Sequence, residues 1–398
     1  MTREEIEIKM QEDPSDGVLL ELPTGYGKTR LALQRMDYLL CEYEEPKILI
    51  VVPRVVLYDE WVKEVKKWGY EKYLSFIAFS TYVSYPKHKE QYDFIIYDEA
   101  HSLSDRCLTH LQDMIDCSNV KQFVMLSATI DRNKKAELLD ICPSLSVIQV
   151  TVKAAIKDKV LPDPKVYLIP LKLNNKTLSC EIIKNKKLTT PPIKVSYKDR
   201  FKYKMIKNRK IIISCTQQEY YNDITALIEW YKRKSGQKFF MNMYLRASGD
   251  RLKWLSDQKT SFIYKLLQEF EDKRTLTFCN GIQQTELLGK YCINSKNKLS
   301  QTYLSKFNNG KINHITACNM LNMGVNLNNC QIGIYANLNS SQVLVKQRLG
   351  RLLRHPNPII IIPYYENTRD EELVNKMLED YNPELVKKVN CLSQIMIK

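Results

Sequence analysis

The sequence predicts an α/β protein with two tandem domains, each built on a parallel β-sheet flanked by helices. Short apolar segments that suit buried strands alternate with amphipathic segments that suit helices over most of the 398 residues. Strands that are apolar throughout are typical of parallel sheets covered on both faces. The alternation weakens over residues 157–165, where Pro162 and Pro164 interrupt it, and then resumes. We therefore expect a first domain at residues 1–160 and a second at residues 161–398.

The expected elements alternate in both halves of the chain. The first domain should hold strands at residues 17–22, 48–52, 76–80, 94–97, 123–127 and 147–150, and helices at 29–40, 55–68 and 103–115. The second should hold strands at residues 275–279, 314–317, 332–336 and 359–363, and helices at 283–293 and 341–354. We expect two further helices after residue 354.

Charge is distributed unevenly along the chain, whose net charge is +15. Residues 1–150 hold 18 Lys and Arg against 25 Asp and Glu, whereas residues 171–211 hold 13 basic and 2 acidic residues. We expect the second of these segments to be a basic insertion in the second domain. An acidic domain joined to a basic segment suggests a polyanionic partner. A solvated lysine-rich surface would give the same counts.

Other features exclude several classes of protein. The 11 cysteines are scattered and form no Cys-x-x-Cys pair, so a zinc site is not expected. No apolar run approaches the roughly 20 residues of a membrane span. The N-terminus is charged and has no apolar signal core. We therefore expect a cytoplasmic protein, in the host cytoplasm if it is viral, without membrane contact.

A glycine-containing loop joins the first predicted strand to the first predicted helix, which is the setting of a phosphate-binding P-loop. Its glycines let the backbone wrap around phosphate oxygens. Lys28 can reach the β- and γ-phosphates, and Thr29 can ligate Mg²⁺. Leu22 stands where the general pattern has its first glycine. The candidate nucleotide-binding residues here are Pro23, Thr24, Gly25, Tyr26, Gly27, Lys28 and Thr29.

Two carboxylates follow the apolar strand predicted at residues 94–97. Asp98 can hold Mg²⁺ through its water shell. Glu99 can orient or deprotonate the water that attacks a phosphate. His101 could couple this site to the rest of the cleft. An Asp-Glu pair at a strand end can also cap a helix, but its combination with the upstream loop favours a nucleotide site.

The segment Asp98-Glu99-Ala100-His101 resembles the DEAH box of superfamily 2 helicases. Further segments resemble the motifs of that family in the same order: residues 51–54 (motif Ia), 80–82 (Ib), 127–129 (III), 277–280 (IV), 324–327 (V) and 347–354 (VI). The resemblance spans about residues 17–365. It implies two RecA-like domains with an ATP cleft between them.

The resemblance also implies roles for single residues. In motif VI, Gln347, Arg351 and Arg354 are spaced to share one helix face. By resemblance, the two arginines reach across the cleft and stabilise charge on the transferring phosphate. Motif V adds Gly324 and Asn326 to the nucleotide contacts. The implied nucleic-acid contacts are Pro53, Arg54, Ser80, Thr81, Asn280, Cys318 and Asn319.

The chain departs from the family pattern at two places. Cys318 stands where many relatives carry a threonine, whose hydroxyl would bind a nucleic-acid phosphate. No adenine-reading glutamine motif is evident before the loop, where Arg3 and Gln11 are the polar candidates.

The sequence predicts an ATP-dependent DNA helicase or translocase, a nucleic-acid-dependent ATPase that uses ATP and Mg²⁺. The compact layout resembles phage-type DNA helicases and the motor part of type III restriction subunits, and we expect a monomer. An RNA helicase is the alternative, because the motifs do not distinguish the sugars. A clamp without hydrolysis is disfavoured by the presence of Lys28, Glu99 and Arg354. The basic aromatic segment 197–204 either stacks on bases or forms an amphipathic strand.

Overall fold

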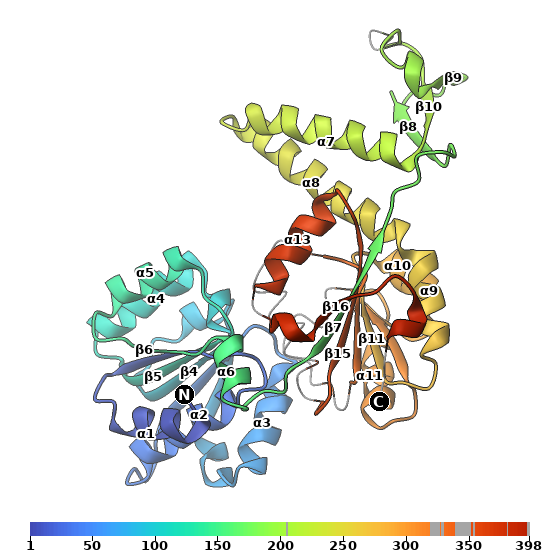
Figure 1. The fold of residues 1–398 in the computed structure, drawn as a ribbon. Coiled ribbons are helices and arrows are strands. Elements are labelled where there is room, and N and C mark those ends of the chain that lie inside the picture. Colours follow the sequence, from blue (N-terminus) through green and yellow to red (C-terminus); the bar gives the residue numbers. More distant parts are fainter. Residues whose placement is uncertain are drawn as a thin grey trace.

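The computed structural model describes residues 1–203, 206–318, 327, 330–338, 352, 355–379 and 381–395 (Figure 1). Within these residues there are two α/β units, each with one parallel sheet flanked by helices, as the sequence predicts. A smaller unit projects from the second of them. None of the described helices is long and apolar enough to cross a membrane.

The first sheet has six strands in the order β3-β2-β4-β5-β1-β6, and all neighbouring strands are parallel. The inner strands β1 and β2 are buried at every residue, which explains why they are apolar apart from Glu21 at the end of β1. The strands are β1 (Gly17–Glu21), β2 (Ile48–Val52), β3 (Ile77–Thr81), β4 (Tyr92–Asp98), β5 (Val120–Ser127) and β6 (Ser146–Gln149). The helices are α1 (Arg3–Glu12), α2 (Lys28–Leu40), α3 (Leu57–Lys67), α4 (Asp105–Asp116), α5 (Arg132–Ile141) and α6 (Val152–Lys157).

This strand order brings three loops of the first unit to one edge of its sheet. β5 lies between β1 and β4, and all three strands run in the same direction. The loops that follow them therefore leave from the same edge, where open α/β sheets bind ligands. Leu22, just after β1, donates its backbone N–H to the carbonyl of Ser127 at the end of β5, at 3.0 Å.

The second sheet has seven strands in the order β12-β13-β11-β14-β15-β7-β16, again with parallel neighbours. The strands are β7 (Lys165–Leu171), β11 (Thr275–Phe278), β12 (Cys292–Ile293), β13 (His314–Ala317), β14 (Ile332–Tyr335), β15 (Ile359–Tyr365) and β16 (Val386–Lys388). The helices are α9 (Thr260–Glu269), α10 (Ile282–Leu288), α11 (Ser300–Asn308) and α13 (Arg369–Leu378). Strands β6 and β7 belong to different sheets, and the domain division at residue 160 between them stays a prediction.

Two helix predictions in the second unit are wrong. The helix expected at residues 283–293 ends at Leu288, because Gly289 is extended with φ of −173°, and the chain continues into the edge strand β12. Of the two helices expected after residue 354, only α13 matches, whereas β16 is an edge strand paired with β7. The helix expected at residues 341–354 lies outside the described residues.

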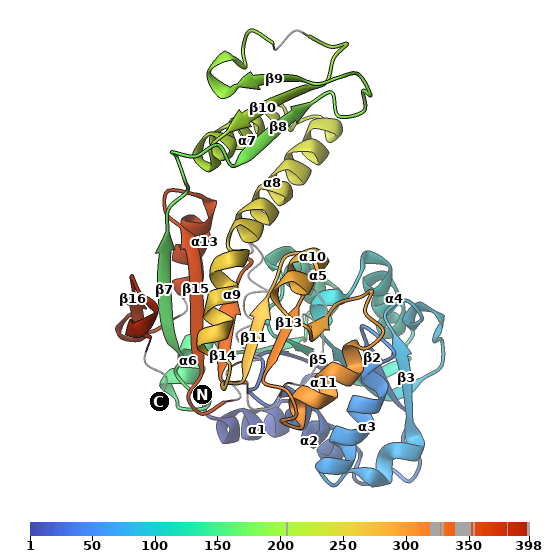
Figure 2. The ribbon, with the colours of Figure 1, turned by 90° about the vertical axis from the view of Figure 1, so that its right-hand side faces the viewer.

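The projecting unit lies between β7 and α9 (Figures 1 and 2). The predicted basic segment contains a three-stranded sheet in which β10 (Ile211–Cys215) pairs antiparallel with β8 (Cys180–Lys184) and parallel with β9 (Ile193–Ser196). Two long helices that the sequence did not predict follow it, α7 (Gln217–Arg233) and α8 (Lys238–Gln258), and they pack against each other.

A buried ion pair fixes the base of this projection. Lys259 joins α8 to α9, and its ammonium lies 2.8 Å from the Asp370 carboxylate at the start of α13. The exposed fractions of the two side chains are 0% and 2%. Lys259 also donates to the carbonyl of Pro363 at 3.3 Å, and Asp370 accepts the backbone N–H of Tyr365 at 3.4 Å. The paired charges are therefore also hydrogen-bonded, as burial requires.

Short 3-10 helices complete the described chain, at Glu71–Phe76 (η1), Tyr85–Lys87 (η2), Ala100–Ser102 (η3), Tyr197–Asp199 (η4), Pro383–Leu385 (η6) and Leu392–Gln394 (η7).

Candidate nucleotide-binding site

The loop after β1 curls back before it enters α2. Gly25 and Gly27 have φ of 88° and 108°, a left-handed backbone that glycine adopts without steric cost. The helix starts at Lys28, so the unpaired N–H groups of its first turn lie beside the loop. The side chain of Leu22 is fully buried and its N–H is bonded to β5. Leu22 thus continues the strand, and no left-handed residue is needed there.

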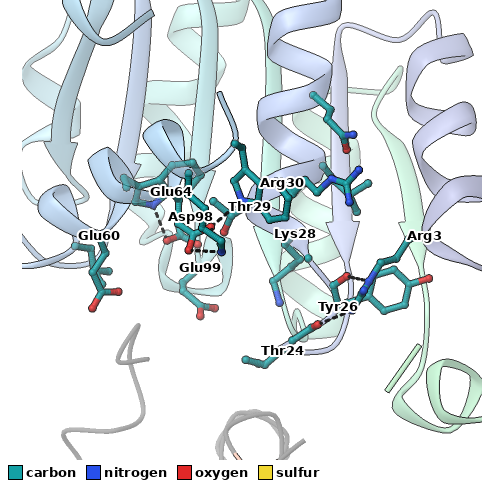
Figure 3. Close-up of a pocket in the computed structure, with 18 of the residues that line it drawn as sticks. Arg3, Thr24, Tyr26, Lys28, Thr29, Arg30, Glu60, Glu64, Asp98 and Glu99 are labelled. Atoms are coloured by element: carbon teal, nitrogen blue, oxygen red, sulfur yellow. Dashed lines mark hydrogen bonds and ion pairs between the residues drawn. The ribbon is translucent and has the colours of Figure 1, made fainter. Parts of the chain in front are cut away.

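The first turn of α1 supports the loop from one side (Figure 3). The Arg3 guanidinium donates to the carbonyls of Tyr26 at 2.8 Å and Gly25 at 3.2 Å. The Tyr26 hydroxyl donates to the Met1 carbonyl at 2.6 Å, and the Tyr26 side chain is buried. Of the two polar candidates named from sequence, Arg3 therefore contacts the loop, whereas Gln11 is exposed on α1 and does not line the pocket.

A pocket of about 500 Å³ lies between this loop, α3 and the end of β4. Residues 24–29 line it, and so do both carboxylates that the sequence singled out, Asp98 and Glu99 (Figure 3). Lys28 Nζ donates to the carbonyl of Leu22 at 2.8 Å, which keeps the ammonium within the curl of the loop. The pocket thus combines backbone N–H groups, one ammonium and two carboxylates.

Asp98 is held by Trp61, which the sequence did not indicate, and by Tyr82, which lies in the segment that resembles motif Ib. Trp61 on α3 donates its indole N–H to Asp98 Oδ2 at 3.0 Å, and the Tyr82 hydroxyl donates to the Asp98 carbonyl at 2.7 Å. Burial and the neighbouring Glu99 charge raise the pKa of Asp98 to about 6, against the opposing effects of Trp61 and Lys28. Trp61 therefore both orients the carboxylate and favours its charged form.

Glu99 has a strained backbone, and its side chain lies beside a series of polar side chains that begins with His101. Its φ of 53° is left-handed, which non-glycine residues adopt at a cost of roughly 1–3 kcal/mol, typically at functional sites. Its carboxylate lies 3.4 Å from His101 Nδ1, and the same ring nitrogen lies 3.4 Å from Ser127 Oγ. Ser127 in turn donates to the carbonyl of Thr129 at 2.9 Å. The ends of β4 and β5 are thus linked through side chains.

Two lysines on α5 fix the backbone around these groups and were also missed. Lys134 donates to the carbonyl of His101 at 3.0 Å and to that of Leu103. Lys135 pairs at 3.1 Å with Glu21, a buried carboxylate that also accepts the backbone N–H of Ile130. A pair of lysines on a helix gives no sequence signal that distinguishes these contacts from a solvated surface.

The nucleic-acid candidates of the first unit lie at the ends of two neighbouring strands. Pro53 and Arg54 follow β2, and Ser80 and Thr81 end β3, with Val52 and Thr81 in register. Arg54 is exposed. Ser80 is 2% exposed, and its hydroxyl donates to the carbonyl of Thr81 at 3.2 Å.

The candidates of the second unit are only partly described. Asn280 follows β11 and Cys318 follows the neighbouring β13, and the Cys318 thiol contacts the Asn280 carbonyl at 3.1 Å. Cys318 is buried. The remaining candidates lie outside the described residues: Asn319, Gly324, Asn326, Gln347, Arg351 and Arg354.

Thr29 and Asp98 both line the pocket and are the candidate Mg²⁺ ligands. No group of three or more His, Cys, Asp or Glu side chains able to hold a metal exists in the described part of the chain. This donor set still fits Mg²⁺, which usually keeps several waters and takes one or two protein ligands together with substrate phosphates.

Two protein-family models match the chain. Residues 2–84 match the family described as type III restriction enzyme, res subunit, and residues 258–356 match the helicase conserved C-terminal domain. The two matches support a superfamily 2 helicase. Among curated protein sequences, none matches this chain.

Three solved structures illustrate the likeness of the fold. The Hef helicase domain of Pyrococcus furiosus is 15% identical with a TM-score of 0.52, over 94% of this chain and 96% of that one. S. cerevisiae Dbp5 bound to RNA and ADP BeF3 is 12% identical with a TM-score of 0.58, over 97% and 88%. A fragment of a type I restriction enzyme HsdR subunit from Vibrio vulnificus YJ016 is 15% identical with a TM-score of 0.58, over 97% and 67%. At these identities the likeness shows the fold.

Proposed function

We propose that this protein is an ATP-dependent DNA helicase or translocase of the DEAH-box type, which couples ATP hydrolysis to movement on, or unwinding or remodelling of, duplex or branched DNA. One observation carries the proposal: the curled loop with Lys28 and the carboxylates Asp98 and Glu99 line a single pocket. The contacts from Glu99 through His101 to Ser127 give this pocket a route to the rest of the first unit.

Each group in the pocket has a defined task in this proposal. The N–H groups of the loop and α2 bind phosphate oxygens, and Lys28 exchanges its contact with the Leu22 carbonyl for the β- and γ-phosphates. Thr29 and Asp98 hold Mg²⁺, which supplies charge neutralisation of the phosphates when it is bound. Glu99 orients the attacking water and accepts its proton.

The sequence motifs of the second unit provide the remaining residues of the proposed site. Arg351 and Arg354, with Gln347, would present their side chains from one helix face toward the γ-phosphate, and Gly324 and Asn326 would add nucleotide contacts. In this proposal these residues would reach the phosphate when the two units close on each other. Hydrolysis is therefore coupled to relative movement of the units.

Nucleic acid is proposed to run along the strand ends of both units. Pro53, Arg54, Ser80 and Thr81 would contact it on the first unit, and Asn280, Cys318 and Asn319 on the second. Ser80 would act through its backbone, because its hydroxyl is buried. DNA is favoured by the match of residues 2–84 to a restriction-enzyme family. The RNA named for the Dbp5 structure keeps an RNA helicase as the alternative. We propose a cytoplasmic monomer.

The test is ATP turnover of the full chain, measured without nucleic acid and with single-stranded, duplex and branched DNA and RNA. We expect the largest stimulation from duplex or branched DNA. Stimulation by RNA alone would select the RNA helicase, and no turnover under any condition would leave only a nucleic-acid-binding clamp.

A further inference from the structure

The two long helices of the projecting unit end in a cluster of aromatic rings. We call residues 230–240 the hairpin tip; they comprise the end of α7, the turn and the start of α8. The Trp230 ring lies 5.1 Å from Tyr231 and 5.7 Å from Phe240 between centroids, and Phe239 lies 5.4 Å from Phe240. All three contacts are edge-on rather than stacked.

These rings are exposed although they are large and apolar. Trp230 is 44% exposed and Phe239 is 67% exposed. In both ribbon views the helices carry the hairpin tip away from the two sheets (Figures 1 and 2). A group of exposed aromatic residues is costly in water and marks a binding surface.

The hairpin tip also carries unneutralised positive charge. Lys232, Arg233, Lys234 and Lys238 lie within seven residues that contain no acidic residue. Over the part of the chain that the structure describes, none of them forms an ion pair with a carboxylate. Lys234 lies 4.4 Å from the centre of the Trp230 ring and 5.4 Å from that of Phe240, so its charge sits on the aromatic cluster itself.

We propose that the hairpin tip binds single-stranded nucleic acid, with unpaired bases stacked on Trp230 and Phe239 and phosphates bound by the surrounding cations. Ring faces beside cations are the combination that binds single strands without sequence preference. A protein partner would need an acidic apolar surface, whereas a single strand provides bases and phosphates at regular spacing. The inference rests on the proposed function, from which it takes nucleic acid as the class of polymer. It adds a binding site that is separate from the ATP pocket.

The proposal is tested with two probes of about 16 nucleotides, the upper range of single-strand site sizes. One probe is fluorescein-labelled oligo-dT, and the other is a labelled sugar-phosphate backbone of the same length without bases. Trp230→Leu combined with Phe239→Leu should weaken oligo-dT binding about tenfold or more, because stacking on each ring is lost, and leave the base-free probe unaffected. Tyr264→Leu, which removes a 49% exposed ring from α9, is the control and should bind both probes like the wild type.

A second variant separates charge from stacking. Replacing Lys232, Arg233 and Lys234 with Gln should lower the salt dependence of oligo-dT binding by a slope of about 2, the value for three phosphate contacts on a single strand. The double aromatic variant should keep the wild-type slope.

Wild-type affinity of the double aromatic variant for oligo-dT would overturn the inference, and so would an equal loss on both probes. ATP turnover without nucleic acid is measured for every variant and should not change. If nucleic acid stimulates ATP turnover but the hairpin tip contributes nothing to oligo-dT binding, only the inference is refuted. A hairpin tip that binds oligo-dT on a protein without ATP turnover would refute only the proposed function.

Discussion

Charged groups at the nucleotide pocket and at the hairpin tip differ in what surrounds them. In the pocket, Asp98 is bonded to Trp61, and Arg3 is bonded to loop carbonyls. At the hairpin tip, Lys232 and Lys238 form no ion pair with any described carboxylate. The first arrangement fixes positions before a ligand arrives, which suits a reaction that needs one geometry. The second provides attraction without fixed geometry, which suits a polymer that slides.

The largest effect is expected where geometry is fixed. Lys28→Ala should abolish ATP hydrolysis by removing phosphate charge compensation, and Glu99→Gln should retain ATP binding while turnover falls by about 10²–10⁴-fold. Assays of phosphate release measure ATP turnover, and equilibrium binding of a fluorescent ATP analogue measures ATP binding. Wild-type turnover by Glu99→Gln would show that another residue orients the water.

Arg354→Ala tests whether the second unit contributes in the same fixed way. We expect kcat to fall by about 10³-fold while ATP binding changes little, because in the proposed mechanism the guanidinium acts after the units close. Steady-state kinetics with saturating DNA give kcat and KM. An unchanged kcat with a raised KM would instead make Arg354 a ground-state binding residue.

Lys259→Met tests the most deeply buried ion pair among the described residues. We expect a loss of about 3–5 kcal/mol in the unfolding free energy of the second unit, because Asp370 would stay buried without its partner. Urea unfolding gives the shift in midpoint. A double variant with Asp370→Asn should regain part of the loss; if it does not, the cost arises from packing rather than from the unpaired charge.

Trp61→Phe tests the support of Asp98. In the proposed mechanism Asp98 holds Mg²⁺ as an ionised carboxylate, so kcat/KM should fall as the pH drops through about 6. Loss of the indole hydrogen bond removes a contact that favours the carboxylate, so the pKa rises and the acid limb should move up by about one pH unit. A pH profile of kcat/KM measures this. An unshifted acid limb would mean that Asp98 does not set it.

The smallest effect is expected on the basic segment before α7. Replacing Lys202, Lys204 and Lys207 with Ala should reduce the salt slope of duplex DNA binding by as much as about 3 and leave basal ATP hydrolysis unchanged. Lys202 already pairs with Asp199 at 2.8 Å, so its share should be the weakest. Lys204 lies outside the described residues. Parallel salt titrations of variant and wild type would assign the segment to solvated surface.

Most of the sheet strands were predictable because parallel strands buried on both faces are apolar throughout, as Ile48–Val52 illustrates, whereas β7 and β12 were not predicted as strands. The meeting of the loop with Asp98 and Glu99 in one pocket also follows from strand direction. The roles of these residues stay predictions. The contact of Trp61 with Asp98 was not predictable, because it depends on how α3 packs against β4.

The helices α7 and α8 were missed for a different reason. A helix is usually recognised by an apolar stripe facing a core, but these two pack mainly on each other and leave Leu227, Trp230 and Leu245 exposed. Their apolar residues therefore do not form a single stripe. The three residues of β16 are too few to show any alternation.

The buried ion pair at Lys259 fixes the C-terminal end of α8 to the second unit, so that α8 moves with this unit as a rigid arm. At 1.5 Å per residue, its 21 residues reach about 30 Å from their root. A rotation of only a few degrees at the root would displace the far end by more than 1 Å. Because Lys259 is anchored to both β15 and α13, the root turns with the second unit instead of flexing against it. A rotation of that unit by roughly 6–7° would therefore move the far end by about 3.4 Å, the spacing of one base along a strand.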